Sequence, residues 1–377
     1  MAVDVAQSHE LDLSFLRAKR QPPAVPSVGS EIGIVDLFSG CGGMTVGAIE
    51  GARRAGRVAS LRLAVDIFTP ALEALQLTLG ADDDRVARLD LASVVGGVAE
   101  AVRPSERRLL KAGEGARLLM AGPPCQGHSA LNNHTRHDDT RNDLYLVVAR
   151  VARLLKPAAV IVENVRGVGR DRRSALANCT AALQELDYTV THKLIDLHSL
   201  GVPQTRVRHV LVATRARGFE FEELRSHVGR SVAWAIEDLQ GIDGMTLFDT
   251  ASVPSEENER RMAWLFAHDA DDLPNEERPV CHRSDHSYRS MYGRLRWDEP
   301  AQTITTGFSS MGQGRFVHPR SPRTLTPHEA ARLQFLPDFM EFSLAEHRSE
   351  LATMIGNAAP PALTMSLVEG LLKQELL

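Results

Sequence analysis

The sequence lacks the features that mark secreted, membrane-bound or zinc-binding chains. Its four cysteines lie far apart and form no CxxC pair, which fits a reducing cytoplasm and gives no support to a zinc site. No run approaches the ~18 apolar residues of a membrane span. Residues 1–30 are polar and do not resemble a signal peptide. We therefore expect a cytoplasmic protein that holds no metal.

A strong net charge is also missing, because the chain carries only -5 at pH 7. Any surface that binds nucleic acid must therefore be local. The basic residues are overwhelmingly arginine. A GC-rich genome explains this bias, and so does a need for planar groups that bind phosphates and base edges. We favour the former, although composition cannot choose. The few lysines are Lys19, Lys111, Lys156, Lys193 and Lys373.

Alternation of predicted strands and helices is present over the first part of the chain. With 377 residues, 43% of them hydrophobic and 24% charged, the chain has an ordinary globular composition. This length suggests about two domains. Residues 1–30 include several prolines and predict a mobile leader. The alternation stops at about residue 215, where charged, irregular sequence begins, and helical patterns return near the C-terminus.

A glycine-rich turn between a predicted strand and a predicted helix is the first candidate ligand site. The strand, Glu31–Phe38, runs into Ser39-Gly-Cys-Gly-Gly43, and a helix is expected from about Met44 to Ala55. Such a turn lets a ligand approach the backbone closely, beside the free N–H groups of the helix. Purely structural turns are at least as common, so the glycines alone leave both interpretations open.

Acidic residues end the next two predicted strands. Asp66 closes Leu61–Asp66, 23 residues after Gly43, where nucleotide-type folds typically bind ribose hydroxyls. Asp90 lies at the end of a third candidate strand, Ala87–Leu91. Together with the glycine turn, these acids favour a cofactor that contains a nucleoside. Because the turn does not have the GxGxxG spacing of dinucleotide sites, we favour S-adenosylmethionine over NAD.

Cys125 follows a short apolar run, Ala116–Met120, that predicts a buried strand. Pro123 and Pro124 then force the backbone out of the sheet, because proline donates no ladder hydrogen bond. The cysteine is thereby placed at the carboxyl end of a strand, where open α/β sheets bind their ligands. A buried structural thiol is the alternative, and these residues alone support the two interpretations about equally.

A carboxylate and three alternating polar residues mark two later strands. Glu163 ends the apolar run Ala158–Val162, and a carboxylate there is costly to bury unless it is paired or functional. Gln204, Arg206 and Arg208 alternate before another predicted strand, so an extended chain would point all three to one side. A solvated edge strand would show the same alternation, so a site and a plain surface both stay open.

The irregular region carries blocks of opposite charge. Acidic residues gather at Asp269–Asp272, whereas Arg278–Arg296 is basic and has aromatic residues interleaved. The loop Gly307–Arg315 is also polar and basic. Basic loops with aromatic residues suit phosphates and bases, but a charged cluster is more often simply solvated.

Six short motifs, in one order over most of the chain, closely resemble the DNA (cytosine-5)-methyltransferase family. Each motif could arise alone by chance, but six in the family's order over roughly 320 residues are a strong signal. They are Asp36-Leu-Phe-Ser-Gly-Cys-Gly-Gly43, Gly122-Pro-Pro-Cys-Gln126, Glu163-Asn-Val165, Gln204-Thr-Arg-Val-Arg208, Arg323-Thr-Leu-Thr-Pro-His-Glu-Ala-Ala-Arg332 and Gly356-Asn357.

The resemblance implies an α/β methyltransferase fold, a Rossmann-like mixed sheet with helices on both faces, and a smaller irregular domain. We expect the large domain to comprise residues 31–219 and 345–377, and the target-recognition domain with the hinge to comprise 220–344. By the same resemblance, S-adenosylmethionine would be bound by residues of several motifs and by the two strand-end acids. These are Phe38, Gly40, Gly42, Asp66, Asp90, Pro123 and Asn357.

Cytosine C5 is too weak a nucleophile to take a methyl group directly, and the resemblance implies how it is activated. The Cys125 thiolate would add at C6 and make C5 nucleophilic. Glu163 would hydrogen-bond the N3/N4 edge and promote protonation at N3. Arg208, with Arg206, would bind the O2 side and neutralise developing charge. Loss of the C5 proton and departure of Cys125 would restore the ring, leaving S-adenosylhomocysteine as the other product.

None of this chemistry can occur in a stacked duplex, so the cytosine must be flipped out of double-stranded DNA at a cost of roughly a few kcal/mol. The segment Gln126–Arg141 resembles the family's mobile catalytic loop, which closes over the flipped nucleotide. The expected DNA contacts come from this loop, the alternating strand and the irregular region. They are Gln126, Ser129, Arg141, Gln204 and Arg315.

Two other functions fit parts of the pattern. An RNA (tRNA) cytosine-5 methyltransferase has the same fold but usually carries a Cys-Phe-Thr stretch, which we do not find here. A non-catalytic DNA-binding relative would need damage outside the reacting residues, all of which are present. We predict a bacterial DNA methyltransferase, monomeric, and either paired with a restriction endonuclease encoded nearby or solitary. The irregular region matches no pattern that would identify the target DNA sequence, which stays open.

Overall fold

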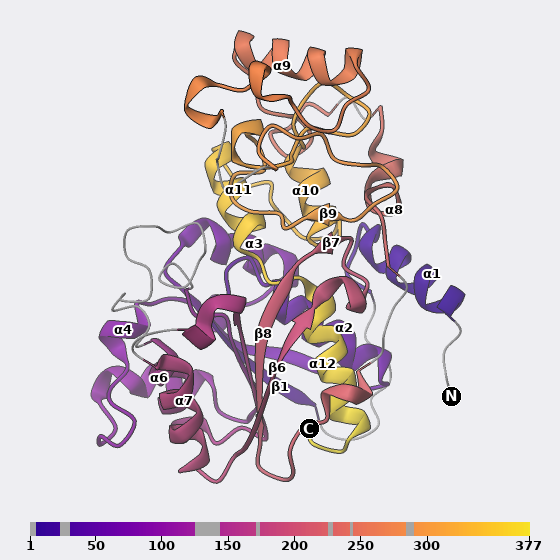
Figure 1. Cartoon of the computed structure of the whole chain (residues 1–377). Coiled ribbons are helices and arrows are strands. Elements are labelled where there is room, and N and C mark those ends of the chain that lie inside the picture. The colour runs from indigo at the N-terminus through magenta and orange to yellow at the C-terminus, as the bar shows by residue number, and fades with distance from the viewer. Residues whose placement is uncertain are drawn as a thin grey trace. The chain divides into compact units, whose positions relative to one another are not determined.

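The chain folds into two compact units in the computed structural model (Figure 1). The structure describes residues 5–22, 31–124, 144–170, 174–224, 229–241, 244–283 and 290–377. Unit 1 comprises Met1–Arg20, Gly201–Arg206 and His227–Ala358. Unit 2 comprises Gln21–Leu200, Val207–Ser226 and Ala359–Leu377.

Unit 2 contains a seven-stranded mixed sheet in the order β3-β2-β1-β4-β5-β8-β6. β8 runs antiparallel to β5 and β6, and the other neighbours are parallel. The chain order reverses between β1 and β4, and ligands bind at the carboxyl ends of strands at such a point. The strands are β1 (Ile32–Leu37), β2 (Ala59–Asp66), β3 (Val86–Arg88), β4 (Ala116–Ala121), β5 (Ala159–Val165), β6 (Thr189–Asp196) and β8 (Val207–Thr214).

Helices cover both faces of this sheet. α6 and α7 lie on one side of it, and α2 and α12 lie on the other (Figure 1). α2 and α12 pack closely at Gly47, where there is no room for a side chain. A Cβ added at Gly47 would lie only 2.1 Å from Pro361 O. The expected α/β fold, with a mixed sheet between helices, is confirmed. The described helices of unit 2 are α2 (Gly43–Arg54), α3 (Thr69–Leu79), α4 (Leu91–Val94), α5 (Arg107–Ala112), α6 (Leu144–Leu155), α7 (Ala175–Gln184) and α12 (Pro361–Lys373).

Unit 1 is irregular, and its described strands are two residues long. Met262 and Leu265 of α9 are buried in a small apolar core with Leu273 and Val317. Its elements are α1 (Val5–Leu16), β7 (Gln204–Thr205), α8 (Val232–Ile236), α9 (Glu256–Ala267), β9 (Ala301–Gln302), α10 (Pro327–Leu333) and α11 (Arg348–Asn357). With so little regular structure, polar side chains supply many of the contacts that hold this unit together.

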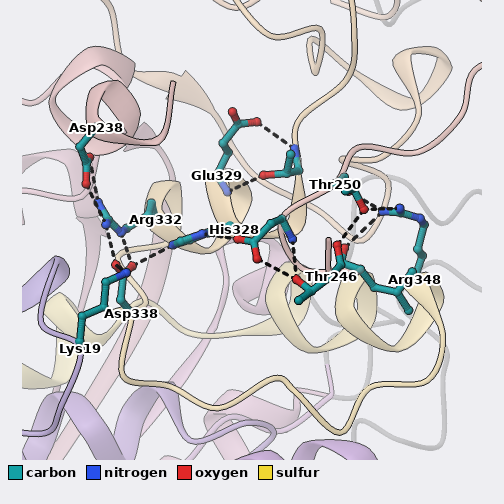
Figure 2. A network of polar contacts seen from close by, with 12 residues as sticks. Lys19, Asp238, Thr246, Thr250, His328, Glu329, Arg332, Asp338 and Arg348 are labelled. Atoms are coloured by element: carbon teal, nitrogen blue, oxygen red, sulfur yellow. Dashed lines mark hydrogen bonds and ion pairs between the residues drawn. The ribbon is translucent and has the colours of Figure 1, made fainter. Parts of the chain in front are cut away.

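A network of charged side chains centred on Asp338 joins the segments of unit 1 (Figure 2). Asp338 accepts hydrogen bonds from Arg332 and, at 2.8 Å, from Lys19 Nζ. His328 contacts a carboxylate at each ring nitrogen, with Asp249 Oδ1 2.9 Å from Nδ1 and Asp338 Oδ1 3.0 Å from Nε2. The side chain of Asp338 is 2% exposed. These contacts join the turn that follows α1, α10 and two loops of the same unit.

Part of the predicted mobile leader is helical and packed, at Val5–Leu16. Val5–Leu16 forms α1, in which Phe15 and Leu16 are buried, and the Phe15 ring stacks on Phe335 with centroids 6.1 Å apart. The helix is ordered because its apolar side chains pack against unit 1. Two further segments, Gly201–Arg206 and α11, also belong to unit 1 and lie outside the boundaries expected for the small domain.

One stretch of the described chain, Arg348–Lys373, is long and apolar enough to cross a membrane by length and composition. It contains α11 and α12. However, 83% of its most apolar window is buried inside the protein. This burial is typical of core helices, and it explains the composition of the stretch.

Candidate active site

The glycine-rich turn joins β1 to α2 at the carboxyl edge of the sheet. Gly40 (φ +52°) and Gly42 (φ +89°) have left-handed backbone conformations, which favour glycine. A Cβ added at Gly42 would lie 2.3 Å from Leu75 Cδ1, whereas one added at Gly40 would meet no atom within 4 Å. Gly42 therefore serves packing, while Gly40 faces open space in which a ligand can approach the backbone.

Asp66 ends β2, and its carboxylate is bound to this turn. Oδ2 accepts the N–H of Gly40 at 2.8 Å, and Oδ1 accepts the N–H groups of Ile67 at 2.7 Å and Phe68 at 2.9 Å. A carboxylate oxygen can accept more than one hydrogen bond, so Asp66 retains capacity for a ligand hydroxyl. The Ile67 side chain is 63% exposed, so an apolar surface lies next to the carboxylate. The sequence did not single out Ile67, because exposure of an apolar residue is not visible there.

Three other residues expected at the cofactor lie in different settings. Phe38 is half-buried at the end of β1 and has φ +59°, which is unusual for a non-glycine residue. Asp90 is exposed and caps α4, where its Oδ1 accepts the N–H of Ala92 at 3.1 Å. Asn357 is the exposed last residue of α11 and belongs to unit 1. Their contacts with a cofactor stay predictions.

Three segments expected at the site meet at Gly122, which follows β4. The N–H of Gly122 donates to Leu37 O at 3.2 Å. A Cβ added at Gly122 would lie 3.9 Å from Phe38 O and 3.9 Å from Glu163 Oε2. The cofactor turn, the segment that leads to Cys125 and the Glu163 carboxylate therefore come together in unit 2.

Glu163 and Arg208 form an ion pair on one face of the sheet. Arg208 Nε lies 2.7 Å from Glu163 Oε1, and each side chain is 12% exposed. Glu163 lies within β5 rather than at its end, because the strand continues to Val165, which pairs with Arg208 of β8. The pair offers solvent both a hydrogen-bond acceptor and a donor, which suits a ring that carries an amino group and a carbonyl.

Gln204 and Arg206 have partners within unit 1 instead. Gln204 Oε1 accepts the N–H of Ile304 at 3.1 Å, and Arg206 Nη1 donates to the Ile304 carbonyl at 3.0 Å. Arg206 Nη2 donates to Ala358 O at 3.3 Å. The two side chains are 0% and 3% exposed. The expectation that Gln204, Arg206 and Arg208 share one side is therefore corrected. The boundary between the units lies directly after Arg206, so Gln204 and Arg206 bond within unit 1 and Arg208 bonds within unit 2.

Arginines of the basic stretch in unit 1 are paired with the acidic stretch before it. Arg315 Nη2 lies 2.6 Å from Asp272 Oδ1, and its side chain is 20% exposed. The other pairs are Arg294 Nη2 with Asp269 Oδ1 at 2.7 Å and Arg296 Nε with Asp271 Oδ2 at 2.7 Å. These three arginines therefore belong to an ion-pair cluster and do not form a bare basic surface. Arg278 and Arg283, in the same basic stretch, donate to backbone carbonyls.

Four predicted site residues lie outside the described part of the chain. They are Cys125, Gln126, Ser129 and Arg141. Among the described cysteines, Cys281 is exposed, whereas Cys41 and Cys179 are buried. Burial raises the pKa of both buried thiols to about 12, so neither is a thiolate nucleophile at neutral pH. The four assignments stay predictions.

Two buried polar residues beside the site were not singled out from the sequence. Asp36 lies in β1, and its Oδ2 accepts the O–H of Thr45 at 2.6 Å. Burial raises the pKa of Asp36 to about 7. Asn164 in β5 is also buried, and its Nδ2 donates to Pro123 O at 3.0 Å. A polar residue inside an otherwise apolar strand was the available signal in both cases.

Comparison with known sequences identifies relatives over nearly the whole chain. The family described as C-5 cytosine-specific DNA methylase matches residues 32–373. The type II methyltransferase M1.BsuMI of Bacillus subtilis is 41% identical over 364 residues, which cover 95% of this chain and 84% of that protein. The type II methylase M.HgiDII of Herpetosiphon aurantiacus is 28% identical, with 88% of this chain and 92% of that protein covered.

Solved structures share the fold at low sequence identity. The Entamoeba histolytica methyltransferase EhMeth has a TM-score of 0.60 at 14% identity, with 92% of this chain and 99% of that chain covered. The S. pombe Dnmt2 methyltransferase has a TM-score of 0.57 at 18% identity, with 91% and 99% covered. Since the family match spans both units and the Bacillus relative is 41% identical, this chain belongs to the C-5 cytosine-specific DNA methylase family and is a DNA (cytosine-5)-methyltransferase.

Proposed function

We propose that this enzyme methylates C5 of a flipped-out cytosine in a specific duplex DNA sequence, through a covalent bond between Cys125 and C6. Methylation of DNA cytosine follows from the family, and the proposal adds the residues and the route. The observation that supports it most is the meeting of three segments at Gly122. There Phe38, Glu163 and the chain that leads to Cys125 converge at the carboxyl edge of the sheet.

S-adenosylmethionine is the methyl donor of this family, and the residues around the glycine turn fit it. The open space at Gly40 permits close approach, Asp66 can accept a hydrogen bond from a ribose hydroxyl, and Ile67 offers an apolar surface to a purine. When bound, the cofactor supplies an electrophilic methyl group. Phe38, Asp90 and Pro123 are the further residues that we propose for this site, and Gly42 supports it by letting the turn pack against Leu75.

We propose a reaction that needs no metal ion. Among the residues that the structure describes, no group of three or more His, Cys, Asp or Glu side chains could hold a metal ion. The proposed methyl transfer needs only the Cys125 thiolate, a proton donor to the ring and a base for the C5 proton. A transfer rate that is unchanged by EDTA is the expected outcome.

Glu163 and Arg208 are proposed to bind and polarise the base. Glu163 accepts a hydrogen bond from the N4 amino group and supports a proton at N3, while Arg208 donates to O2. As the Cys125 thiolate bonds to C6, electron density moves toward C5, which then takes the methyl group. Removal of the C5 proton returns the electron pair to the ring and expels the thiolate. Before a base enters, the two side chains neutralise each other at 2.7 Å, which limits the cost of holding either charge in the site.

DNA recognition is assigned to unit 1 and to the segment after Cys125. Gln126, Ser129, Arg141 and Arg315 are the proposed contacts, and Arg315 would exchange part of its pairing with Asp272 for DNA. We do not carry Gln204 forward as a contact, because its amide is buried and hydrogen-bonded within unit 1. We further propose a monomer in the bacterial cytoplasm that acts alone or beside a restriction endonuclease.

Bisulfite sequencing of DNA from cells that express the enzyme tests this proposal and identifies the target sequence. We expect protected cytosines at one recurrent sequence with the natural chain and none with Cys125→Ser. Cys281→Ser is the matched control, because it makes the same substitution at an exposed cysteine of unit 1. Methylation by Cys125→Ser would refute the covalent route. Methylation of tRNA in place of DNA would favour the RNA alternative.

A further inference from the structure

We infer that Asn164 is a positioning residue that fixes the path of the chain as it leaves β4 toward Cys125. The inference rests on the proposed role of Cys125 and adds a residue that touches neither base nor cofactor. It starts from two hydrogen bonds in unit 2, one on each side of β4. The N–H of Gly122 donates to Leu37 O of β1 at 3.2 Å, and Asn164 Nδ2 of β5 donates to Pro123 O at 3.0 Å.

Few other hydrogen bonds can fix the direction of the backbone at this point. Pro123 and Pro124 have no N–H groups, so neither can donate a backbone hydrogen bond to a neighbouring strand. Their rings fix φ at both residues, and a following proline confines Pro123 to extended conformations. The rotation that remains at Pro123 is ψ, which sets the orientation of the peptide plane between the two prolines. The hydrogen bond to Pro123 O restrains that plane directly.

The Pro123 carbonyl also needs a donor, because Pro123 is buried. A buried carbonyl without a partner loses the hydrogen bonds that it makes with water in the unfolded chain. Asn164 is suited to supply the donor, since its side chain is 2% exposed and its Oδ1 accepts the N–H of Val165 at 2.7 Å. With Oδ1 bound to Val165, the amide must turn Nδ2 toward Pro123. An aspartate would keep the first contact and lose the second.

The position of Asn164 in the strand gives this contact a functional consequence. Glu163 and Asn164 are consecutive in β5, so their side chains point to opposite faces of the sheet. Glu163 pairs with Arg208, and Asn164 holds the segment that leads to Cys125. One rigid strand therefore sets the base-binding carboxylate and the nucleophile's segment relative to each other. Small displacements of reacting groups cost large factors in rate.

The test compares Asn164→Asp with the natural enzyme in thiol reactivity and in turnover. Alkylation of each cysteine by iodoacetamide is followed by mass spectrometry from about pH 6 to pH 9, a range that spans ordinary thiol ionisation. Exposed Cys281 is the internal reference, and buried Cys41 and Cys179 should stay unmodified. We expect the Cys125 rate relative to Cys281 to change at least ~5-fold, and kcat to fall ~10-fold or more with KM for DNA nearly unchanged.

A matched control removes a similar hydrogen bond away from the site. Tyr188 is buried, and its O–H donates to Pro157 O, another proline carbonyl of unit 2, at 2.7 Å. Tyr188→Phe should change neither the Cys125 alkylation profile nor kcat. Asn164→Ala introduces no charge and keeps the test decisive if Asn164→Asp does not fold.

Two results would overturn the inference. One is a folded Asn164 variant with natural alkylation of Cys125 and natural kcat. The other is a Tyr188→Phe enzyme that reproduces the changes, since these would then follow from any lost buried hydrogen bond. Failure of the proposed function is distinguishable, because it appears as turnover by Cys125→Ser, whereas alkylation reports the environment of Cys125 in every variant that retains this cysteine.

Discussion

Two neighbouring arginines, one in each unit, serve different purposes. Arg208 in unit 2 is half-buried and pairs with one carboxylate, Glu163. Arg206, two residues earlier, is buried in unit 1, where it donates to backbone carbonyls. Arg332 in unit 1 is also buried and donates to Asp238 and Asp338. The role of an arginine is therefore decided by the acceptors around its guanidinium group.

The difference follows from how each unit satisfies its backbone. In unit 2 the strands of a seven-stranded sheet bond to one another, so carbonyl groups within the sheet need few side-chain donors. Outside the sheet, buried Arg150 donates to the carbonyls of Val98, Glu100 and Ala101. Unit 1 has two strands of two residues among its described elements, and its irregular backbone leaves carbonyls for other partners. Arginine has five N–H donors in a planar fork and meets that need efficiently.

The largest expected effect is on the charged pair of unit 2. Glu163→Gln keeps a hydrogen-bond acceptor for the N4 amino group but cannot support a proton at N3. We expect methyl transfer to fall by about 10³-fold, measured as kcat under saturating DNA. Glu222→Gln is the control, because Glu222 forms an exposed pair with Lys193 in the same unit. A near-natural rate for Glu163→Gln would remove Glu163 from the mechanism.

Arg206 and Arg208 give the sharpest comparison of the two units. We expect Arg208→Ala to lower kcat/KM about 10²-fold with little change in the free energy of unfolding. Arg206→Ala should lower that free energy by about 3 kcal/mol, because it strips donors from buried carbonyls.

All three tryptophans, Trp234, Trp264 and Trp297, lie in unit 1, so their fluorescence in urea reports unfolding of that unit. A stable Arg206→Ala enzyme with poor capture of cytosine would restore the original catalytic assignment of Arg206. It would also contradict the proposal that Arg206 stabilises unit 1 while Arg208 serves the reaction.

Asp338→Asn tests the network of unit 1. Burial raises the pKa of Asp338, but hydrogen bonds from Arg332 and His328 outweigh it and hold the pKa well below its usual range. The charged form therefore stabilises the fold above the ordinary pKa of about 3.9, and this contribution is lost as pH falls below that value. At neutral pH we expect Asp338→Asn to cost about 3 kcal/mol.

Tryptophan fluorescence in urea measures the effect, with Asp269→Asn as the control at an exposed carboxylate of the same unit. The Asp338→Asn enzyme should also lose less stability on acidification than the natural enzyme. If the natural enzyme and Asp338→Asn lose equal stability on acidification, the charge of Asp338 does not stabilise the fold.

The smallest expected effect comes from Asp36 in unit 2, and its sign is opposite. Because burial raises the pKa of Asp36 to about 7, the folded state retains a proton that the unfolded state releases above about pH 4. Stability is therefore lost as pH rises toward 7, and Asp36→Asn should remove about 2 kcal/mol of that loss between pH 5 and pH 8.

Urea unfolding followed by far-UV circular dichroism checks this prediction in the natural enzyme and in Asp36→Asn. Thr45→Val is a useful companion, since it removes the hydrogen bond that Asp36 accepts at 2.6 Å. Parallel pH profiles for Asp36→Asn and the natural enzyme would show that Asp36 does not titrate between pH 5 and pH 8 in the folded protein.

Much of the fold could be predicted because local patterns encode it. The strand, glycine turn, helix and second strand from Ile32 to Asp66 were expected close to their observed bounds. The predictions failed where a partner lies far along the chain. α1 is ordered by packing of Phe15 on Phe335, and Arg206 bonds to Ile304, which is 98 positions away.

The sequence by itself determined the family, the order of the motifs and the residue types that carry the chemistry. It did so because a motif is a local string, and a thiol, a carboxylate or a guanidinium keeps its chemistry in any fold. Tertiary structure decided which charged residues are available to a ligand. Glu163 and Arg208 stay partly exposed, whereas Gln204 and Arg206 are buried and hydrogen-bonded within unit 1. Such pairing depends on distances between remote segments, which spacing along one strand cannot specify.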